Sequence, residues 1–235
     1  MTASLALALL LVLTPGQAAP PSGDTVQARA ARTLEGVQDY TATLDVVVSM
    51  ERMSVPPMRA TVYFKRPNKL HVAADGFALI PREGLGAGVA DWPQRYTGGE
   101  VTMDTVGERP VYRVAVTARS DRTQFRRGFL FVHRERWTTE RIVLQSSEGR
   151  SMTATLTYDR VEGHWLPRLI TVAFAAVAAD TTEPLPGQAP LPVPRRTPRT
   201  GTVDIRCSDY RVNTGLPDEL FEERPESDSA RPPGR

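Results

Sequence analysis

The sequence has a single cysteine, Cys207, and few residues that carry chemistry. One cysteine excludes an intramolecular disulfide, and we expect it to pack as a small apolar side chain rather than react as a thiol. The three histidines, His71, His133 and His164, lie far apart and have no partner at metal-ligand spacing. Nucleophile-elbow, phosphate-loop and dinucleotide-binding motifs are absent. The sequence therefore predicts no enzyme, no metal and no cofactor, and we interpret residues 133–135 as a charge cluster at a strand end.

The chain also lacks a strong charge of either sign and a membrane-spanning hydrophobic run. Its formal net charge is only +2, and its basic residues are scattered, so no nucleic-acid partner is expected. The apolar run at residues 5–13 is shorter than the roughly 20 residues that a bilayer requires. Small residues, Ala18 and Ala19, follow it, and no Lys or Arg precedes it. We interpret residues 1–19 as a cleavable signal peptide, which predicts a periplasmic, non-lipidated protein; the alternative is a buried N-terminal helix.

What the sequence does contain is a long series of polar/apolar alternations. A period of two residues places the apolar side chains on one face of an extended strand. Short turns between successive segments predict antiparallel hairpins. A helix is expected over residues 24–36, with Asp24 as its N-cap and Gly36 at its end. The expected strands cover residues 39–51, 58–65, 69–75, 101–105, 111–117, 129–134, 141–145, 152–158, 166–177 and 202–207.

These elements predict a mainly β protein with a few helices. Roughly ten strands in hairpins are expected to form one open, strongly curved antiparallel sheet, a half-barrel wrapped over the N-terminal helix. Residues 24–222 are expected to form a single domain. The glycine-rich segment 77–96 is predicted to be a lid-like excursion with a helical turn, and the proline-rich segment 181–200 a loop, because proline cannot donate to a ladder. Residues 223–235 are expected to be a disordered tail.

Four short motifs of this chain, taken together, look like those of one known family. They are VQDYTA at 37–42, FKRPNKL at 64–70, DGF at 75–77, and CSDYRVN at 207–213 leading into LPDELF at 216–221. Together they resemble the LolA-like superfamily, over residues 25–222. The resemblance implies an open barrel over helices with an apolar cavity for acyl chains. It also implies lipids or lipoproteins as ligands, sorted to the outer membrane with an inner-membrane release complex and an outer-membrane acceptor as partners.

The apolar faces of the first strands supply the candidate lining of a lipid site, which needs no catalytic residue. Burial of one methylene stabilises a complex by about 0.8 kcal/mol, so an acyl chain can be held by contact alone. Each lining residue could also be plain core, and we expect a monomer. The candidate lipid-binding residues are Leu44, Val46, Val48, Val62, Phe64, Leu70 and Val72, with Phe77 and Trp92 as lid contacts.

Two other functions remain open at this point. One is a regulatory binding module like the RseB-type relatives, in which the cavity senses lipoproteins and another surface binds a signalling partner. Those relatives carry a second domain, for which few residues remain after Phe221. The other is a structural envelope protein whose interior is filled by its own side chains.

Overall fold

The computed structural model describes residues 19–51, 53–74, 91–176 and 200–222. Most of them belong to strands, which alternate between buried and exposed positions. The strands are β1 Asp39–Met50, β2 Met53–Ser54, β3 Met58–Lys65, β4 Lys69–Ala74, β5 Tyr96–Val106, β6 Arg109–Ala118, β7 Phe125–His133, β8 Thr139–Ser146, β9 Arg150–Val161, β10 His164–Ala176 and β11 Gly201–Val212. The helical elements are α1 Gly23–Ala31, α3 Trp92–Arg95 and the 3₁₀ helix η2 Asp218–Phe221.

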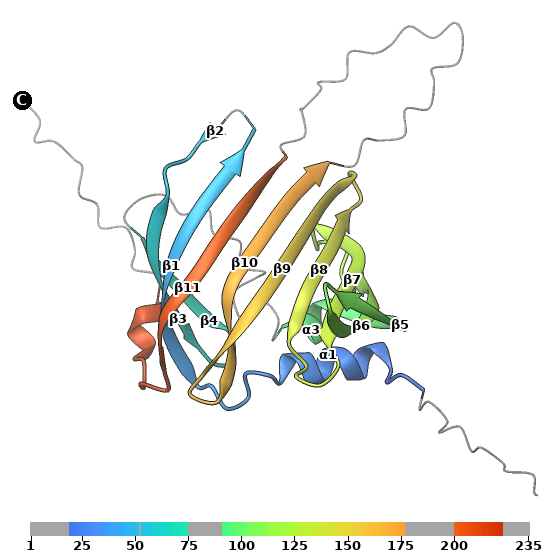
Figure 1. Ribbon diagram of the computed structural model, residues 1–235, viewed down its shortest axis with the longest axis horizontal. Coiled ribbons are helices and arrows are strands. Elements are labelled where there is room, and N and C mark those ends of the chain that lie inside the picture. Colours follow the sequence, from blue (N-terminus) through green and yellow to red (C-terminus); the bar gives the residue numbers. More distant parts are fainter. Residues whose placement is uncertain (1–18, 52, 75–90, 177–199, 223–235) are drawn as a thin grey trace, which may run out of the picture.

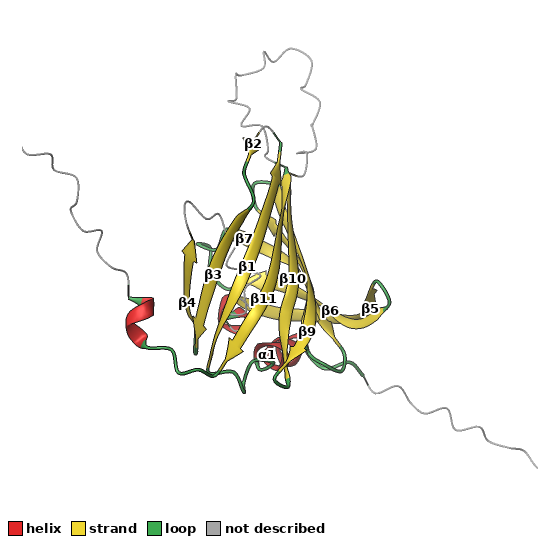
Figure 2. Ribbon diagram, turned by 60° about the vertical axis from the view of Figure 1, so that its left-hand side comes forward, coloured by secondary structure: helices red, strands yellow, loops and turns green. Residues whose placement is uncertain are grey.

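The strands form one antiparallel sheet in the order β4-β3-β1-β11-β10-β9-β8-β7-β6-β5, with β2 paired to β1 outside this path (Figure 1). The sheet is strongly curved (Figure 2). Within the described ranges the outermost strands β4 and β5 do not pair with each other, so the sheet is not closed. The expected open half-barrel is therefore confirmed.

One face of the sheet is largely apolar across most of its strands. A row of directly paired residues crosses seven strands from β1 to β6, and each of its members is at most 7% exposed. Because side chains alternate along a strand, the residues before and after each member of this row point to the other face of the sheet, which is more polar. The inner face is the apolar face predicted from the alternation. The row consists of Val48, Val203, Val172, Ala154, Ile142, Leu130 and Val114.

The two strands whose lengths differ most from the prediction both contain an irregularity. β11 runs to Val212 instead of residue 207, and its register against β1 shifts next to Asp209, which has φ +52°. β5 begins at Tyr96 instead of residue 101, and its register against β6 shifts between Gly98 and Val101. A bulge inserts an extra residue and interrupts the period of two in the sequence. The alternation therefore predicts that the strand ends at the bulge, although the backbone continues as a strand beyond it.

Helix α1 is shorter than predicted, and its N-cap is a different residue. Ser22 Oγ accepts a hydrogen bond from the Thr25 N–H at 3.3 Å, so Ser22 is the N-cap, and the helix ends at Ala31. Asp24 lies in the first turn, where its Oδ1 accepts from Gly98 N–H at 2.9 Å. A carboxylate that binds the neighbouring strand is not free to cap its own helix. The predicted cap and the predicted end at Gly36 were therefore wrong.

The helix covers the β5 end of the apolar face. Its main contacts are with β5, β6 and α3 (Figure 1). Its Arg29 guanidinium lies 4.6 Å from the centre of the Trp137 ring, which in turn stacks on Tyr112 of β6 at 5.6 Å. A guanidinium over an aromatic face is attractive, so this stack fixes α1 against the sheet. Among the described residues no helix is long and apolar enough to cross a membrane.

Candidate functional site

The structure brings the described members of the predicted lining into a single apolar cluster on the inner face. Five of them, Leu44, Val46, Val62, Phe64 and Trp92, are at most 1% exposed. Val48 is 7% exposed, while Leu70 and Val72 are partly buried and pack against the others. The ninth predicted residue, Phe77, lies outside the described residues.

The predicted lid residue Trp92 is the first residue of α3, so the segment around it does contain a helical turn. Its indole ring stacks on Tyr96 with 4.6 Å between ring centres. Tyr96 begins β5, and its hydroxyl lies 3.4 Å from the Phe125 carbonyl of β7. Trp92 is thus buried against the β5 end of the inner face.

A hollow opens where β1 and β11 meet at one rim of the sheet. Its volume is about 510 Å³. Of the predicted lining, Val48 reaches it, together with Met50 from the same face of β1. A Cβ on Gly201 would lie 2.6 Å from Met50 Cγ and 2.8 Å from Ser49 O, so only glycine allows the two strands to approach so closely here. The hollow is lined by Val48, Ser49, Met50, Glu51, Val55, Thr200 and Gly201.

At the opposite end of these strands, Asp39 holds the segment that follows β11. Its Oδ1 accepts from the Thr214 N–H at 2.8 Å, and its Oδ2 accepts from the N–H groups of Gly215 at 3.0 Å and Leu216 at 3.3 Å. Asn213, at φ +55°, accepts from the Gln38 N–H at 2.7 Å through its Oδ1. These contacts tie the beginning of β1 to the end of β11.

The β3–β4 hairpin joins the same cluster through its lysines. The ammonium groups of Lys65 and Lys69 lie 2.7 and 3.0 Å from the Asp218 carboxylate, and their hydrogen bonds lower the pKa of Asp218. Lys65 also donates to the Leu216 carbonyl at 2.7 Å. Three of the four sequence motifs that resemble the LolA-like superfamily therefore meet in space. The contacts of these motif residues hold β1, β3 and β11 together. The motifs therefore indicate the fold and do not identify a ligand.

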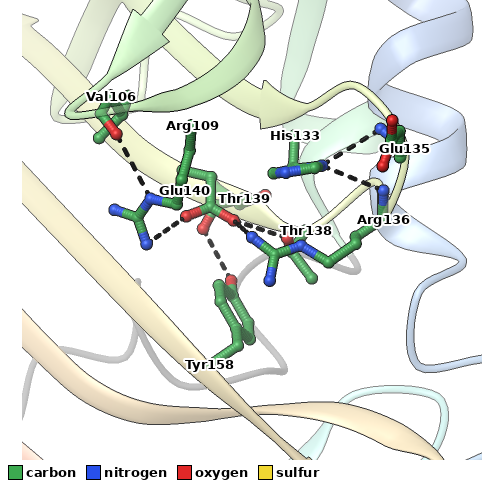
Figure 3. A network of polar contacts seen from close by, with 9 residues as sticks. All are labelled: Val106, Arg109, His133, Glu135, Arg136, Thr138, Thr139, Glu140 and Tyr158. Atoms are coloured by element: carbon green, nitrogen blue, oxygen red, sulfur yellow. Dashed lines mark hydrogen bonds and ion pairs between the residues drawn. The ribbon is translucent and has the colours of Figure 1, made fainter.

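A buried carboxylate, Glu140, occupies an inward-facing position of β8 (Figure 3). It is 0% exposed. Arg109 Nη1 lies 2.8 Å from its Oε2, Arg136 Nη2 lies 3.3 Å from its Oε1, and Thr138 Oγ1 donates to Oε1 at 2.7 Å. Two cations and a hydroxyl offset the desolvation of this charge. Sequence reasoning missed Glu140, although a charge in phase with Ile142 and Leu144 was the available signal.

His133 ends β7 beside this carboxylate, which confirms its predicted place at a strand end. Its Nδ1 accepts from the backbone N–H groups of Glu135 and Arg136, both at 3.2 Å, so the neutral ring organises the turn. Burial, and after it the nearby Arg136 guanidinium, lowers the pKa of His133. Among the described residues no three His, Cys, Asp or Glu side chains group as metal ligands.

This environment predicts a pH dependence that a single substitution removes. The pKa of His133 is below 6.5 in the folded state, so the unfolded chain binds a proton more readily than the folded protein does. The neutral His133 therefore contributes fully to the free energy of unfolding above pH 6.5, and this contribution is lost as the pH falls through the folded-state pKa. His133→Asn keeps an acceptor for the turn but does not titrate. Urea unfolding at pH 7.5 and 5.5 should show a smaller acid loss in the variant, with stability at pH 7.5 within about 1 kcal/mol of wild type. Equal acid losses in both proteins would contradict this assignment.

Cys207 packs on the inner face opposite Leu44, 6% exposed, as expected of a small apolar residue. Burial raises the pKa of its thiol to about 11. The thiolate is the reactive form, so this cysteine is inert near neutral pH.

Comparisons with known proteins bear on the fold. No family model matches the chain, and no curated protein matches it. Solved structures do. A DUF1329 family protein from Desulfovibrio piger has a TM-score of 0.59 at 16% identity, covering 87% of this chain and 98% of its own. A LolA superfamily protein from Nitrosomonas europaea has a TM-score of 0.54 at 11% identity, covering 87% and 99%.

A third structure is similar over a comparable length. It is a domain from Vibrio parahaemolyticus described as an outer membrane lipoprotein-sorting protein, with a TM-score of 0.57 at 12% identity, covering 85% of this chain and 95% of its own. At these identities the likeness is one of fold. The chain has a LolA-like fold, as the sequence motifs predicted.

Proposed function

We propose that this protein is a periplasmic carrier that binds the acyl chains of lipids or lipoproteins on the inner face of its half-barrel. The observation that supports this most is the hollow of about 510 Å³ at the rim of the sheet, which is lined in part by Val48 of the inner face. Ligand pockets in proteins commonly measure about 300–1,000 Å³, so the hollow is large enough to admit one end of an acyl chain. Ser49, Glu51 and Thr200 give its rim a polar character that suits a ligand with one polar end.

The energetics of such a site favour transport over permanent storage. Sixteen buried methylenes would contribute at most about 13 kcal/mol, while association costs about 4–15 kcal/mol. The two quantities are similar, so binding is reversible, and a carrier must release what it holds. No chemical step is needed, and the proposed function is not catalytic.

Lipoprotein sorting is the proposed setting. It is supported by the LolA-like fold and by the domain from Vibrio parahaemolyticus described in those terms. The apolar run at residues 5–13, read as a signal peptide, supports a periplasmic location. In this setting an inner-membrane complex would load the carrier and an outer-membrane acceptor would unload it, with the carrier as a monomer.

Two adjacent valines of β1 provide a matched test. Val48 faces the hollow, whereas Val47 points to the other face and is 45% exposed. Val48→Asp places a charge where an acyl chain enters, so the affinity for the fluorescent fatty acid 11-(dansylamino)undecanoic acid should fall at least tenfold. Val47→Asp should leave it within twofold of wild type. Fluorescence titration measures both values, and Val48→Thr, which keeps the side-chain shape, should have an intermediate affinity.

The outcomes separate the competing functions. If the wild-type protein does not bind the probe at micromolar concentration, the inner face is closed by its own side chains and the protein is a structural one. If all four proteins bind equally, the ligand does not enter at Val48. A regulatory module would bind the probe as a carrier does, but would in addition co-purify with a signalling protein.

A further inference from the structure

Three arginines gather on the outer face of the sheet, which is the face opposite the apolar inner one. Strands β6, β7 and β8 lie side by side in the sheet (Figure 1). Arg113 of β6 pairs directly with Phe131 of β7, and Phe131 pairs with Arg141 of β8. Each of these three is next in the chain to a member of the buried inner row, so each points outward. Arg127 lies on the same outer face of β7, four residues before Phe131.

Two of the guanidinium groups lie over phenyl rings. Arg113 Cζ is 3.9 Å from the centre of the Phe129 ring, and Arg141 Cζ is 5.9 Å from the centre of the Phe131 ring. Phe131 is 8% exposed and belongs, with Phe129 packed against it, to a small apolar cluster separate from the inner one. A guanidinium stacked on a ring keeps its charge and its planar set of N–H donors. We call Arg113, Arg127 and Arg141, with the two phenylalanines, the arginine patch.

The positive charge of the arginine patch is not balanced by neighbouring carboxylates. None of its arginines forms an ion pair within the part of the chain that the structure describes. The carboxylates of the adjoining turns, Asp121 and Glu148, are paired with Arg126 and Arg150 instead. Asp104 of the edge strand β5 lies on the same face, but it forms no ion pair with the patch. Three guanidinium groups are therefore left for an anionic partner.

The outer face has a different character around β1 and β11. Arg206 of β11 pairs with Asp45 of β1, and Asp45 forms an ion pair with Arg59 of β3 at 2.8 Å. The two arginines around Asp45 thus have a carboxylate beside them, which the arginine patch lacks. Arg206 is therefore a suitable comparison for a residue of the patch, since it carries the same charge on the same face of the sheet.

The exposed chemistry of the arginine patch suits an anionic lipid surface better than a protein partner. Interfaces between proteins have an apolar centre, whereas the phenyl rings of the patch are covered by guanidinium groups. The large apolar side chains that are exposed among the described residues, Val47 and Met103, belong to β1 and β5. Attraction to anionic headgroups requires positive charge but no exposed apolar centre. A guanidinium also matches phosphate, because it donates two parallel hydrogen bonds.

We propose that the arginine patch is a docking surface for the phosphate headgroups of an anionic membrane. The contact uses the outer face, so it goes beyond the proposed binding of acyl chains and does not require an occupied inner face. A basic residue near an anionic lipid surface strengthens binding about fivefold, and the effect weakens as salt screens the charges.

Co-sedimentation with lipid vesicles tests this proposal. The wild-type protein should bind vesicles of equal parts phosphatidylglycerol and phosphatidylcholine, less so as salt is added, and should not bind vesicles of phosphatidylcholine alone. Arg127 is exposed and has no ring contact, so it can be replaced without uncovering a phenylalanine. Arg127→Gln should weaken the affinity for the anionic vesicles about fivefold, whereas Arg127→Lys, which keeps the charge, and Arg206→Gln should each stay within about twofold of wild type.

The possible results have distinct meanings. If wild type does not bind the anionic vesicles, or binds neutral ones equally well, the docking surface is overturned. Equal losses in Arg127→Gln and Arg206→Gln would show that net charge and not the patch is responsible, which also overturns it. Binding of a glutamate-rich peptide without binding of vesicles would replace the membrane by an acidic protein. A protein that binds the anionic vesicles but not 11-(dansylamino)undecanoic acid would keep the docking surface and lose the carrier function.

Discussion

Gly98→Ala should lower the free energy of unfolding by about 3 kcal/mol, the upper range for inserting a methyl group into a packed interior. A Cβ at this position would lie 2.3 Å from Gly23 C and 2.5 Å from Asp24 N. Both are backbone atoms of α1 and its first turn, so no side-chain rotation relieves the overlap. The helix must move off β5, and the hydrogen bond from Gly98 N–H to Asp24 is strained or lost.

The neighbouring glycine is the matched control. A Cβ on Gly99 would have its nearest atom, Ala115 O, at 3.5 Å, which is an ordinary contact. Gly99→Ala should therefore change stability by no more than about 0.5 kcal/mol. Urea unfolding followed by circular dichroism measures both variants. Similar, small effects at the two positions would contradict the docking of α1 on β5.

Asp39→Ala should lower the free energy of unfolding by about 3 kcal/mol, because it removes the acceptor of three backbone N–H groups in the segment after β11. Asp39 is 4% exposed, so water replaces the lost carboxylate poorly. The effect should extend beyond the substituted residue. Without Asp39, the ends of β1 and β11 are expected to fray, and hydrogen exchange of the amides paired between Tyr40 and Val212 should accelerate.

A second aspartate of β1 provides the comparison. Asp45 pairs with Arg59 at 2.8 Å, but their side chains are 43% and 75% exposed. Ion pairs in water contribute about 0–1 kcal/mol, so Asp45→Ala should be nearly neutral. If the two alanine variants unfolded at the same urea concentration, Asp39 would not be the residue that fastens β1 to β11.

The strands were predictable because their pattern is local. β9 shows this most clearly, since Met152, Ala154 and Leu156 are at most 1% exposed and each lies between more exposed neighbours. The pairing of β1 with β11 was not predictable in the same way. It joins segments at opposite ends of the domain, and nothing in either alternation specifies the partner. Asp39 and Asn213, whose contacts tie these two strands together, belong to two of the motifs, yet neither motif predicted the pairing.

The candidate site was predictable only in its apolar part. Leu44 and Phe64 are recognisable as inward-facing because they repeat with a period of two. The buried Glu140 of β8 and Gln27 of α1 were not recognised as inward-facing, because an isolated polar residue in an alternating or helical pattern is ordinarily read as facing solvent. Their burial depends on the register of neighbouring strands and on the docking of α1, which are tertiary features.

The most direct test of acyl-chain binding is native mass spectrometry of the protein exported to a bacterial periplasm and purified without detergent. We expect a population heavier than the polypeptide by the mass of a lipid or an acylated peptide, which organic extraction removes. Val48→Asp should reduce that population and Val47→Asp should not. A spectrum with the bare polypeptide alone, unchanged after incubation with phospholipid vesicles, would contradict the account.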